Sequence, residues 1–207
     1  MNQNKQVIRH NITQQRKQLS KAQQQLRSQQ IANHLSQSTY FTQAIHIAYY
    51  LPIANEADPS LLQKSTKNTA NISTHNNKKT FYLPIVAQHG ENSLLFAKVH
   101  KNTGYKKNKY GIKEPIYHTK DLLAADQLDL VITPLVGFDD QGNRLGMGGG
   151  YYDRTFAFKC KNNINTKKTP ILIGYAYDFQ QVSKLQAKSW DIPLDGIVTE
   201  SGILLLK

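Results

Sequence analysis

The sequence predicts an α/β fold: a single three-layer domain over residues 1–207, with helices on both faces of a mixed or largely parallel sheet. Two observations predict this fold. Segments with helical periodicity alternate along the chain with short apolar runs of strand length. The length of 207 residues suits one sizeable core and is short for two full domains, and no internal repeat is visible.

A first helix is predicted between residues 4 and 19. Its apolar side chains, at Ile8, Ile12 and Leu19, fall within one narrow stripe at about 100° per residue. An adjoining stripe carries three basic side chains, which are Lys5, Arg9 and Arg16. We therefore expect one edge of this helix to pack against the protein while the neighbouring edge presents three cations.

A second helix is predicted from a capping box, in which Ser20 is followed by Gln23. The apolar positions that follow are Ala22, Leu26, Ile31 and Leu35. A short helix is expected to begin at Asp58 and Pro59, which suit an N-cap and a first turn. A last helix is expected to begin within a glycine run and to carry Tyr152, Phe156 and Phe158.

Apolar runs bounded by turn residues predict the strands. They cover residues 44–51, 80–86, 93–99, 128–133, 171–175 and 197–199. Residues 69–79 are expected to form a polar loop or a frayed helix, and residues 105–115 a loop that contains Gly, Lys and Pro.

The net charge of +12 calls for an anionic partner or a large solubility reserve. The basic residues are spread along the chain, and the cluster at 159–168 is interleaved with Asn and Thr as in a solvated loop. A nucleic-acid-binding protein would more usually mix basic residues with exposed aromatics or carry a known motif. Small polyanions suit the same charge, so we expect no nucleic-acid partner.

Several other classes of protein are disfavoured. No apolar run is long enough to cross a membrane, and the N-terminus lacks the apolar block of a signal peptide. Cys160 is the single cysteine, so no internal disulfide forms and a reducing cytoplasm is expected. The seven His residues lack metal-ligand spacing, which makes a structural zinc site improbable. We expect a cytoplasmic monomer that acts on small molecules.

The most informative segment is GFDDQGNRLGMGGGYYDR, which follows a predicted strand and leads into a predicted helix. This arrangement aims free backbone N–H groups at an anion. The glycines let a phosphate approach the main chain closely; they are Gly146, Gly148, Gly149 and Gly150. Arg144 supplies a planar cation suited to phosphate oxygens, and Asp153 is placed to hold Mg²⁺ that bridges them.

Two common phosphate motifs do not match. A Walker A loop would end in Gly-Lys-Ser or Gly-Lys-Thr, whereas Gly150 is followed by two tyrosines. A dinucleotide fingerprint that starts at Gly146 would need glycine where Tyr151 stands. A plainer alternative is a glycine-rich turn with residues 139–143 as a hairpin tip.

The segment NRLGMGGGYYDR resembles the signature of the 5-formyltetrahydrofolate cyclo-ligase family. Further stretches resemble the family's blocks in the same order: the Lys5–Arg9 element, YYLPIANEAD, FYLPIV, GIKEP and WDIPLDGIVTE. The stretches are distributed across nearly the whole chain. Ile8 stands where leucine is usual, and Met147 occupies a variable position.

The resemblance implies an ATP- and Mg²⁺-dependent enzyme that converts 5-formyltetrahydrofolate to 5,10-methenyltetrahydrofolate. A formamide oxygen is a poor leaving group, so it must be activated before N10 of the folate can displace it. Transfer of the γ-phosphoryl group to that oxygen activates it, and ring closure then releases phosphate. The protein contributes positioning and charge stabilisation.

The resemblance also implies roles for individual residues. ATP is bound by Lys5, Arg9, Arg144, Leu145, Gly146, Met147, Gly148, Gly149, Gly150, Tyr151 and Tyr152. The folate is bound by Leu51, Glu56, Glu114, Met147, Gly148, Gly149, Gly150 and Tyr151. Mg²⁺ is held by Asp153 and Asp191, and the catalytic residues are Arg144, Tyr151 and Tyr152.

Each role has a plainer alternative. The cations of the first helix also suit an ordinary solvated face, and Arg16 matches the family too loosely to enter the site. Leu51 suits a core position, and one of the two tyrosines suits one as well. Asp191 suits a turn before Pro193, and Glu114 a loop cap. Two other functions stay open: nucleic-acid binding, and folate binding without turnover.

Overall fold

The computed structural model describes residues 4–68, 78–87, 92–160 and 169–206, and its centre is a mixed β-sheet. The eight strands of this sheet lie in the order β12-β11-β10-β7-β1-β2-β3-β6. The five central strands, from β11 to β2, are parallel, and antiparallel strands complete both edges. The predicted α/β class with a mixed sheet is confirmed.

The sheet strands are β1 (His46–Ala48), β2 (Thr80–Val86), β3 (Leu94–Lys98), β6 (Leu122–Leu123), β7 (Leu130–Thr133), β10 (Ile171–Tyr175), β11 (Gly196–Thr199) and β12 (Gly202–Leu205). Two hairpins stand outside the sheet: β4 (Tyr105–Lys107) with β5 (Lys113–Pro115), and β8 (Gly137–Phe138) with β9 (Arg144–Leu145). The helices are α1 (Lys5–Gln18), α2 (Lys21–Gln37), α3 (Thr39–Gln43), α4 (Leu61–Asn68) and α5 (Tyr151–Thr155). Short 3₁₀ helices are η1 (Thr119–Asp121), η2 (Ala125–Gln127), η3 (Ala157–Cys160) and η4 (Asp178–Gln180).

Both N-terminal helices begin at a capping residue, and the cap of the second helix is the predicted one. The Asn4 side chain accepts a hydrogen bond from the Gln6 amide at 2.9 Å and so caps α1. Ser20 and Gln23 form the predicted capping box at the start of α2, with bonds of 2.9 and 3.2 Å. These bonds satisfy amides that the first turn of a helix leaves without partners.

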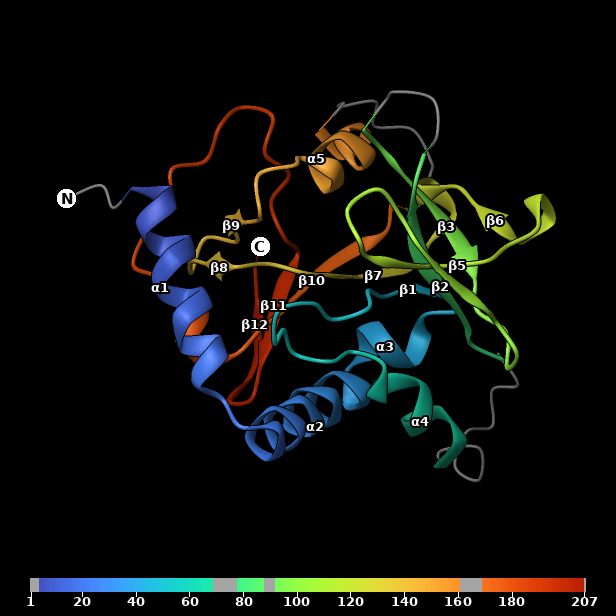
Figure 1. Cartoon of the computed structure of the whole chain (residues 1–207), viewed down its shortest axis with the longest axis horizontal. Helices are drawn as coiled ribbons and strands as arrows, with labels where there is room; N and C mark the ends of the chain where they lie inside the picture. Colours follow the sequence, from blue (N-terminus) through green and yellow to red (C-terminus); the bar gives the residue numbers. More distant parts are fainter. Residues whose placement is uncertain (1–3, 69–77, 88–91, 161–168, 207) are drawn as a thin grey trace.

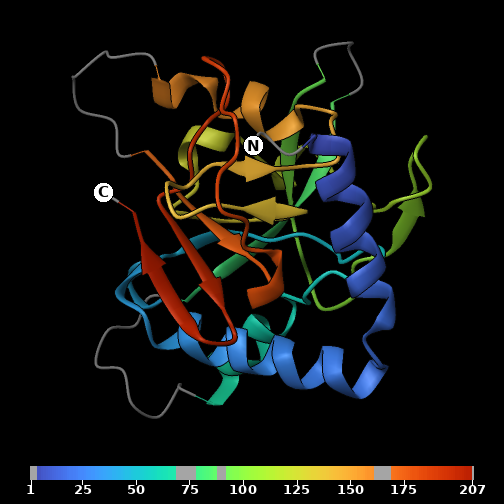
Figure 2. The same cartoon turned by 90° about the vertical axis from the view of Figure 1, so that its left-hand side faces the viewer.

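The sheet has α2, α3 and α4 on one side and α5 on the other (Figures 1 and 2), and an apolar cluster lies against each face. On one face, Ile31, Leu35 and Phe41 bring α2 and α3 against β7 and β10, together with α4. The other face is covered by α5, η3 and the segment that leads into β11. Alternate residues of β7 serve the two layers, since Leu130 and Ile132 belong to the first and Val131 to the second.

Helix α1 lies beside the β8–β9 hairpin (Figure 2), where Ile8 and Ile12 pack against Val136 and Leu145. The apolar stripe of this helix is therefore confirmed. Its cationic stripe is only partly so, because Arg16 is 1% exposed and does not face solvent. Its side chain is buried and forms a salt bridge with Glu56, which follows β1.

Other local predictions need correction. The run at residues 44–51 forms only the three-residue strand β1, because the chain then turns toward the pocket. Residues 105–115, predicted as a loop, contain the β4–β5 hairpin. Strands β6 and β12 were not predicted. Of the three residues expected in the last helix only Tyr152 lies in α5, since Phe156 is the C-cap and Phe158 lies in η3. Residues 69–77 of the predicted polar loop lie outside the described residues.

Candidate functional site

A pocket of about 770 Å³ lies at the carboxyl ends of the parallel strands. Its wall includes residues that follow β1 and β7, such as Tyr50 and Leu135, and the end of β2 at Val86. Ligands of open α/β sheets bind at this edge, because loops there diverge and leave a crevice. Every site residue predicted from the sequence lines this one pocket.

The glycine-rich segment contains both a hairpin and an open loop. Residues 139–143 form the tip of the β8–β9 hairpin, where Asp139 Oδ1 accepts hydrogen bonds from the Gln141 and Asn143 amides. The hairpin alternative is therefore correct for that part of the segment. The glycines that follow, at residues 146–150, lie beyond β9 in the wall of the pocket.

The backbone of this glycine loop is suited to an anion. Its amides at residues 146–150 donate no hydrogen bond to any of the described residues. Gly148 and Gly150 have φ of +102° and +64°, values that L side chains rarely adopt. Helix α5 begins at Tyr151 as predicted but has only five residues. Any capacity of this segment to bind an anion therefore lies in the loop amides more than in a helix dipole.

Two arginines donate hydrogen bonds to carbonyl groups of the glycine loop. Arg9 on α1 donates from Nε to the Gly146 carbonyl at 2.8 Å, and Lys5, one turn earlier, lines the same pocket. Arg154 on α5 donates to the Gly149 carbonyl, and its Nε donates to the Asn92 carbonyl at 3.1 Å. These contacts place several cations around the unpaired amides.

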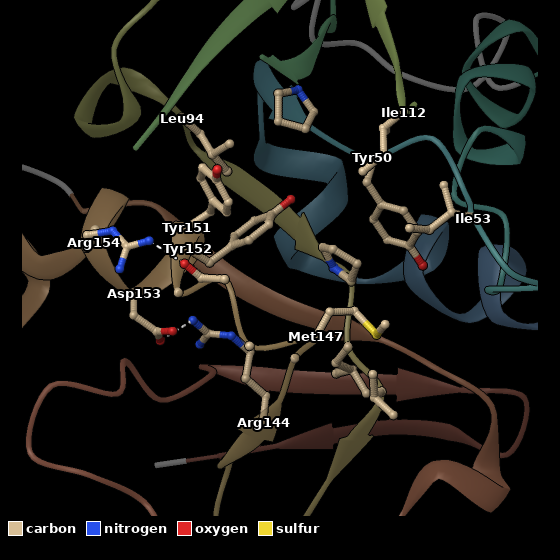
Figure 3. A pocket seen from close by; sticks show the side chains of 18 of the residues that line it. Tyr50, Ile53, Leu94, Ile112, Arg144, Met147, Tyr151, Tyr152, Asp153 and Arg154 are labelled. Atoms are coloured by element: carbon tan, nitrogen blue, oxygen red, sulfur yellow. Dashed lines mark hydrogen bonds and ion pairs between the residues drawn. The ribbon is translucent and has the colours of Figure 1, made fainter. Parts of the chain in front are cut away.

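Arg144 lies at the base of the loop, next to Asp153 (Figure 3). Its Nη2 atom is 2.6 Å from Asp153 Oδ1, and Nη1 donates to the Ile192 carbonyl. Burial lowers the pKa of Arg144, while the charge of Asp153 opposes this shift. A guanidinium stays protonated in proteins, so Arg144 is a fixed positive charge in the wall of the pocket.

The two predicted metal ligands occupy the same part of the pocket. Asp153 Oδ1 accepts two hydrogen bonds, one from Arg144 and one from the Ile192 amide at 3.2 Å. Asp191 accepts from the Lys188 amide, so it also anchors a turn. Within the described residues no group of three or more His, Cys, Asp or Glu side chains could hold a metal. Two carboxylates completed by substrate phosphates are the usual donor set for Mg²⁺, and the pair fits it.

The opposite end of the pocket is more apolar, with Tyr50, Ile53 and Ile112 grouped there (Figure 3). Leu51 is half-buried and lines it, so a pocket abuts this leucine. Glu56 places a nearly buried carboxylate beside these groups, 3.4 Å from Arg16. Burial raises the pKa of Glu56, while the Ile53 amide and Arg16 oppose that shift.

Glu114 has a structural role in addition to lining the pocket. Its Oε1 accepts from the Val86 amide at 2.9 Å and from Asn108 Nδ2 at 2.8 Å. The carboxylate thus joins the β4–β5 hairpin to the end of β2. This contact supports the loop-capping alternative for Glu114.

The two tyrosines of the motif have different surroundings. The Tyr151 hydroxyl lies 2.7 Å from that of Tyr110, which extends from the β4–β5 hairpin. Tyr152 stacks on Phe156, and burial raises its pKa well above the ordinary value. Tyr152 therefore combines a core contact with a place in the wall between the two ends of the pocket (Figure 3).

Some lining residues were missed by sequence reasoning. They include Asn108, Tyr110, Arg154, Lys188 and Trp190. Arg154 closes the glycine motif, and Lys188 and Trp190 adjoin Asp191, so proximity to predicted residues was a usable signal for these three. Asn108 and Tyr110 carry no such signal, because only the β4–β5 hairpin brings them to the pocket.

The fold and the pocket define an α/β protein in which a glycine loop with unpaired amides lines a pocket at the edge of a mixed sheet. The sequence pattern of the 5-formyltetrahydrofolate cyclo-ligase family matches residues 1–200. The 5-formyltetrahydrofolate cyclo-ligase of Escherichia coli (strain K12) is 36% identical, over 93% of this chain and 98% of that protein. That of Haemophilus influenzae is also 36% identical, over 95% of this chain and 97% of the relative.

A solved structure supports the same assignment. The NMR structure of Aquifex aeolicus 5,10-methenyltetrahydrofolate synthetase superposes with a TM-score of 0.75 at 28% identity, covering 98% of this chain and 93% of that one. The chain therefore belongs to the 5-formyltetrahydrofolate cyclo-ligase family and is an enzyme, a ligase. None of the described helices is both long and apolar enough to span a membrane.

Proposed function

We propose that this enzyme converts 5-formyltetrahydrofolate to 5,10-methenyltetrahydrofolate, using ATP and Mg²⁺ and releasing ADP and phosphate. The observation that carries the proposal is the continuity of one pocket. It joins unpaired loop amides and several cations at one end to an apolar wall with a buried carboxylate at the other. The phosphates of a nucleoside triphosphate would suit the first end, and the ring of a reduced folate would suit the second.

The polar end suits the nucleotide. Lys5, Arg9 and the amides of residues 146–150 would bind the phosphates, with Arg144 at the base of the loop. Asp153 and Asp191 would hold Mg²⁺, which neutralises phosphate charge when bound. These side chains supply positioning and electrostatic stabilisation, which is what phosphoryl transfer requires of a protein.

The other end suits the folate. The donor edge of the pterin would bind Glu56, whose carboxylate is an acceptor of such bonds, and Leu51 would pack on the ring. The formyl oxygen would then lie near Tyr151 and Tyr152, between the two ends of the pocket. After phosphoryl transfer to that oxygen, attack by N10 closes the ring and phosphate leaves.

The acidic residues of the pocket disfavour nucleic-acid binding. Among the described residues four carboxylates line it, those of Glu56, Glu114, Asp153 and Asp191. A groove for a phosphodiester backbone is expected to be more uniformly cationic. A monomeric state and a cytoplasmic location remain expectations from the sequence.

The test is a spectroscopic assay of purified protein with 5-formyltetrahydrofolate, ATP and Mg²⁺. We expect the absorbance of the methenyl product to grow with one ADP released per turnover, and no growth when ATP is omitted. Folded protein that binds the folate but forms neither product would instead indicate a folate-binding protein without turnover. Binding to RNA that weakens steeply with salt, with no turnover, would favour the nucleic-acid function.

A further inference from the structure

Arg16 is a buried cation in a place where burial is costly. Arg16 is 1% exposed, and its Nε and Nη1 atoms have no hydrogen-bond partner among the described residues. Removing a guanidinium from water is unfavourable unless an opposite charge lies close by. The charge that lies close by is Glu56, with Oε1 at 3.4 Å from Nη1.

The same residue also holds the backbone that carries Glu56. Asn55 Nδ2 donates to the Arg16 carbonyl at 3.2 Å. Ala54 and Asn55 have φ of +46° and +60°, the left-handed region that non-glycine residues adopt at some cost. Arg16 therefore contacts the Glu56 turn twice, through its main chain and through its guanidinium.

Helix α1 connects this contact to the nucleotide end of the pocket. Arg9 and Arg16 are seven residues apart, nearly two full turns, so both leave the same face of α1 about 10 Å apart along its axis. Arg9 contacts the glycine loop, and Arg16 contacts Glu56. One helix thus supports both ends of the pocket, with a different arginine at each.

The charge state of Glu56 depends on few neighbours. Burial raises its pKa, and the Ile53 amide and Arg16 lower it. The other titratable groups that interact with it are Tyr50, which follows β1, and Tyr152 on α5, and burial raises the pKa of both hydroxyls. Among these groups only Arg16 is a cation. If Arg16 is lost, only the Ile53 amide opposes the rise that burial causes in the pKa of Glu56.

We propose that Arg16 is a positioning residue for folate recognition. It keeps the Glu56 carboxylate ionised and fixed in the wall of the pocket, so that both oxygens are acceptors for the donor edge of the pterin. The proposal rests on the proposed function of the pocket. It assigns Arg16 no contact with either substrate.

The test compares Arg16→Gln with wild type in steady-state kinetics on 5-formyltetrahydrofolate and ATP. We expect the folate KM to rise about tenfold or more, as for loss of a charged hydrogen bond, with the ATP KM unchanged. The folate KM of this variant should also increase more steeply as the pH is lowered than that of wild type, because loss of the Arg16 charge raises the pKa of Glu56 further and favours its protonated form. Lys17→Gln is the matched control, since Lys17 is the adjacent exposed cation of α1.

A double-mutant cycle separates positioning from a general effect on the fold. If Arg16 acts through Glu56, its replacement changes the folate KM little in a Glu56→Gln background. Should Arg16→Gln not fold, Arg16→Lys takes its place in the cycle, with a smaller but measurable rise in the folate KM. An unchanged folate KM, equal rises in both KM values, or additivity with Glu56→Gln would overturn the proposal. Absence of turnover by the wild-type enzyme would instead reject the proposed function.

Discussion

Arg144 and Asp153 form a 2.6 Å ion pair that joins the two ends of the glycine loop. Arg144 belongs to β9, which precedes the loop, and Asp153 to α5, which follows it. The Arg144 side chain is only 6% exposed, so the pair is largely screened from solvent by the protein. The ion pair therefore fixes the span over which the loop presents its amides, in addition to any contact with a substrate.

Replacing Arg144 with alanine is expected to affect both activity and stability. We expect kcat/KM to fall by about 100-fold or more, because the proposed site would lose one preorganised cation near the phosphoryl group that it transfers. The free energy of unfolding should fall by about 3 kcal/mol, because Asp153 loses its buried partner. Steady-state kinetics and thermal unfolding measure the two effects, with activity assayed below the melting temperature.

Arg27→Ala is the matched control for Arg144→Ala. Arg27 also forms an ion pair, with Glu200, but it does not line the pocket and is partly exposed. Its loss should leave kcat/KM within about twofold of wild type, because Arg27 lies outside the lining of the pocket. Wild-type kinetics in Arg144→Ala would reject a role for Arg144 at the phosphates.

Asp153→Asn and Asp191→Asn test the proposed magnesium site. Asparagine keeps a carbonyl oxygen in place but removes the negative charge that Mg²⁺ prefers. We expect the Mg²⁺ concentration for half-maximal activity to rise about tenfold or more in each variant, and excess Mg²⁺ to recover part of the rate. Asp140→Asn, at an exposed carboxylate of the hairpin tip, should behave as wild type. A normal Mg²⁺ dependence in both pocket variants would place the metal elsewhere.

Much of the site followed from sequence because its residues are neighbours along the chain. The glycine loop, Arg144 and Asp153 lie within one short segment, so turn and phosphate chemistry were sufficient to group them. Helical periodicity grouped Lys5 and Arg9 on one stripe of α1, both line the pocket, and Arg9 contacts this loop. The end of that face at Arg16 was misjudged, because its partner Glu56 comes from a turn after β1 that periodicity does not place.

The short strands set another limit. β1 has three residues and β6 two, so their apolar runs either continue into pocket loops or are too brief to detect. The β4–β5 hairpin read as a loop because all three β4 residues are exposed and two are lysines. Tyr110 and Asn108 were missed for the same reason. Residues that reach the pocket from this hairpin become visible only once its pairing is known.

Gly148→Ala tests the backbone of the glycine loop. At φ +102° an alanine is strained, and its Cβ would come 3.8 Å from Arg9 Nη2. The backbone strain of the alanine is about 1 to 3 kcal/mol, and the loop would shift to relieve it. We therefore expect the ATP KM to rise about tenfold. Gly202→Ala is the control: it lies at φ +141° with open space around its Cβ, in the turn between β11 and β12. An equal effect of both substitutions on the ATP KM would show that the loop geometry is not specific to the nucleotide.

Because Glu56 is buried, the free energy of unfolding of the enzyme should depend on pH. Burial raises the native pKa of this carboxyl, so between about pH 4.3, where an exposed Glu titrates, and the raised native value the folded state binds more protons than the unfolded state. Stability from this group is therefore fully present below that window and is lost as the pH rises through it.

Glu56→Gln cannot titrate, so the unfolding free energy of wild type minus that of the variant should decrease from pH 4 to pH 7. This trend holds whatever constant offset the unpaired Arg16 adds to the variant. Denaturant unfolding of both proteins across this range measures the difference. A difference that increases with pH would mean that Arg16 outweighs burial and holds the Glu56 pKa below its ordinary value.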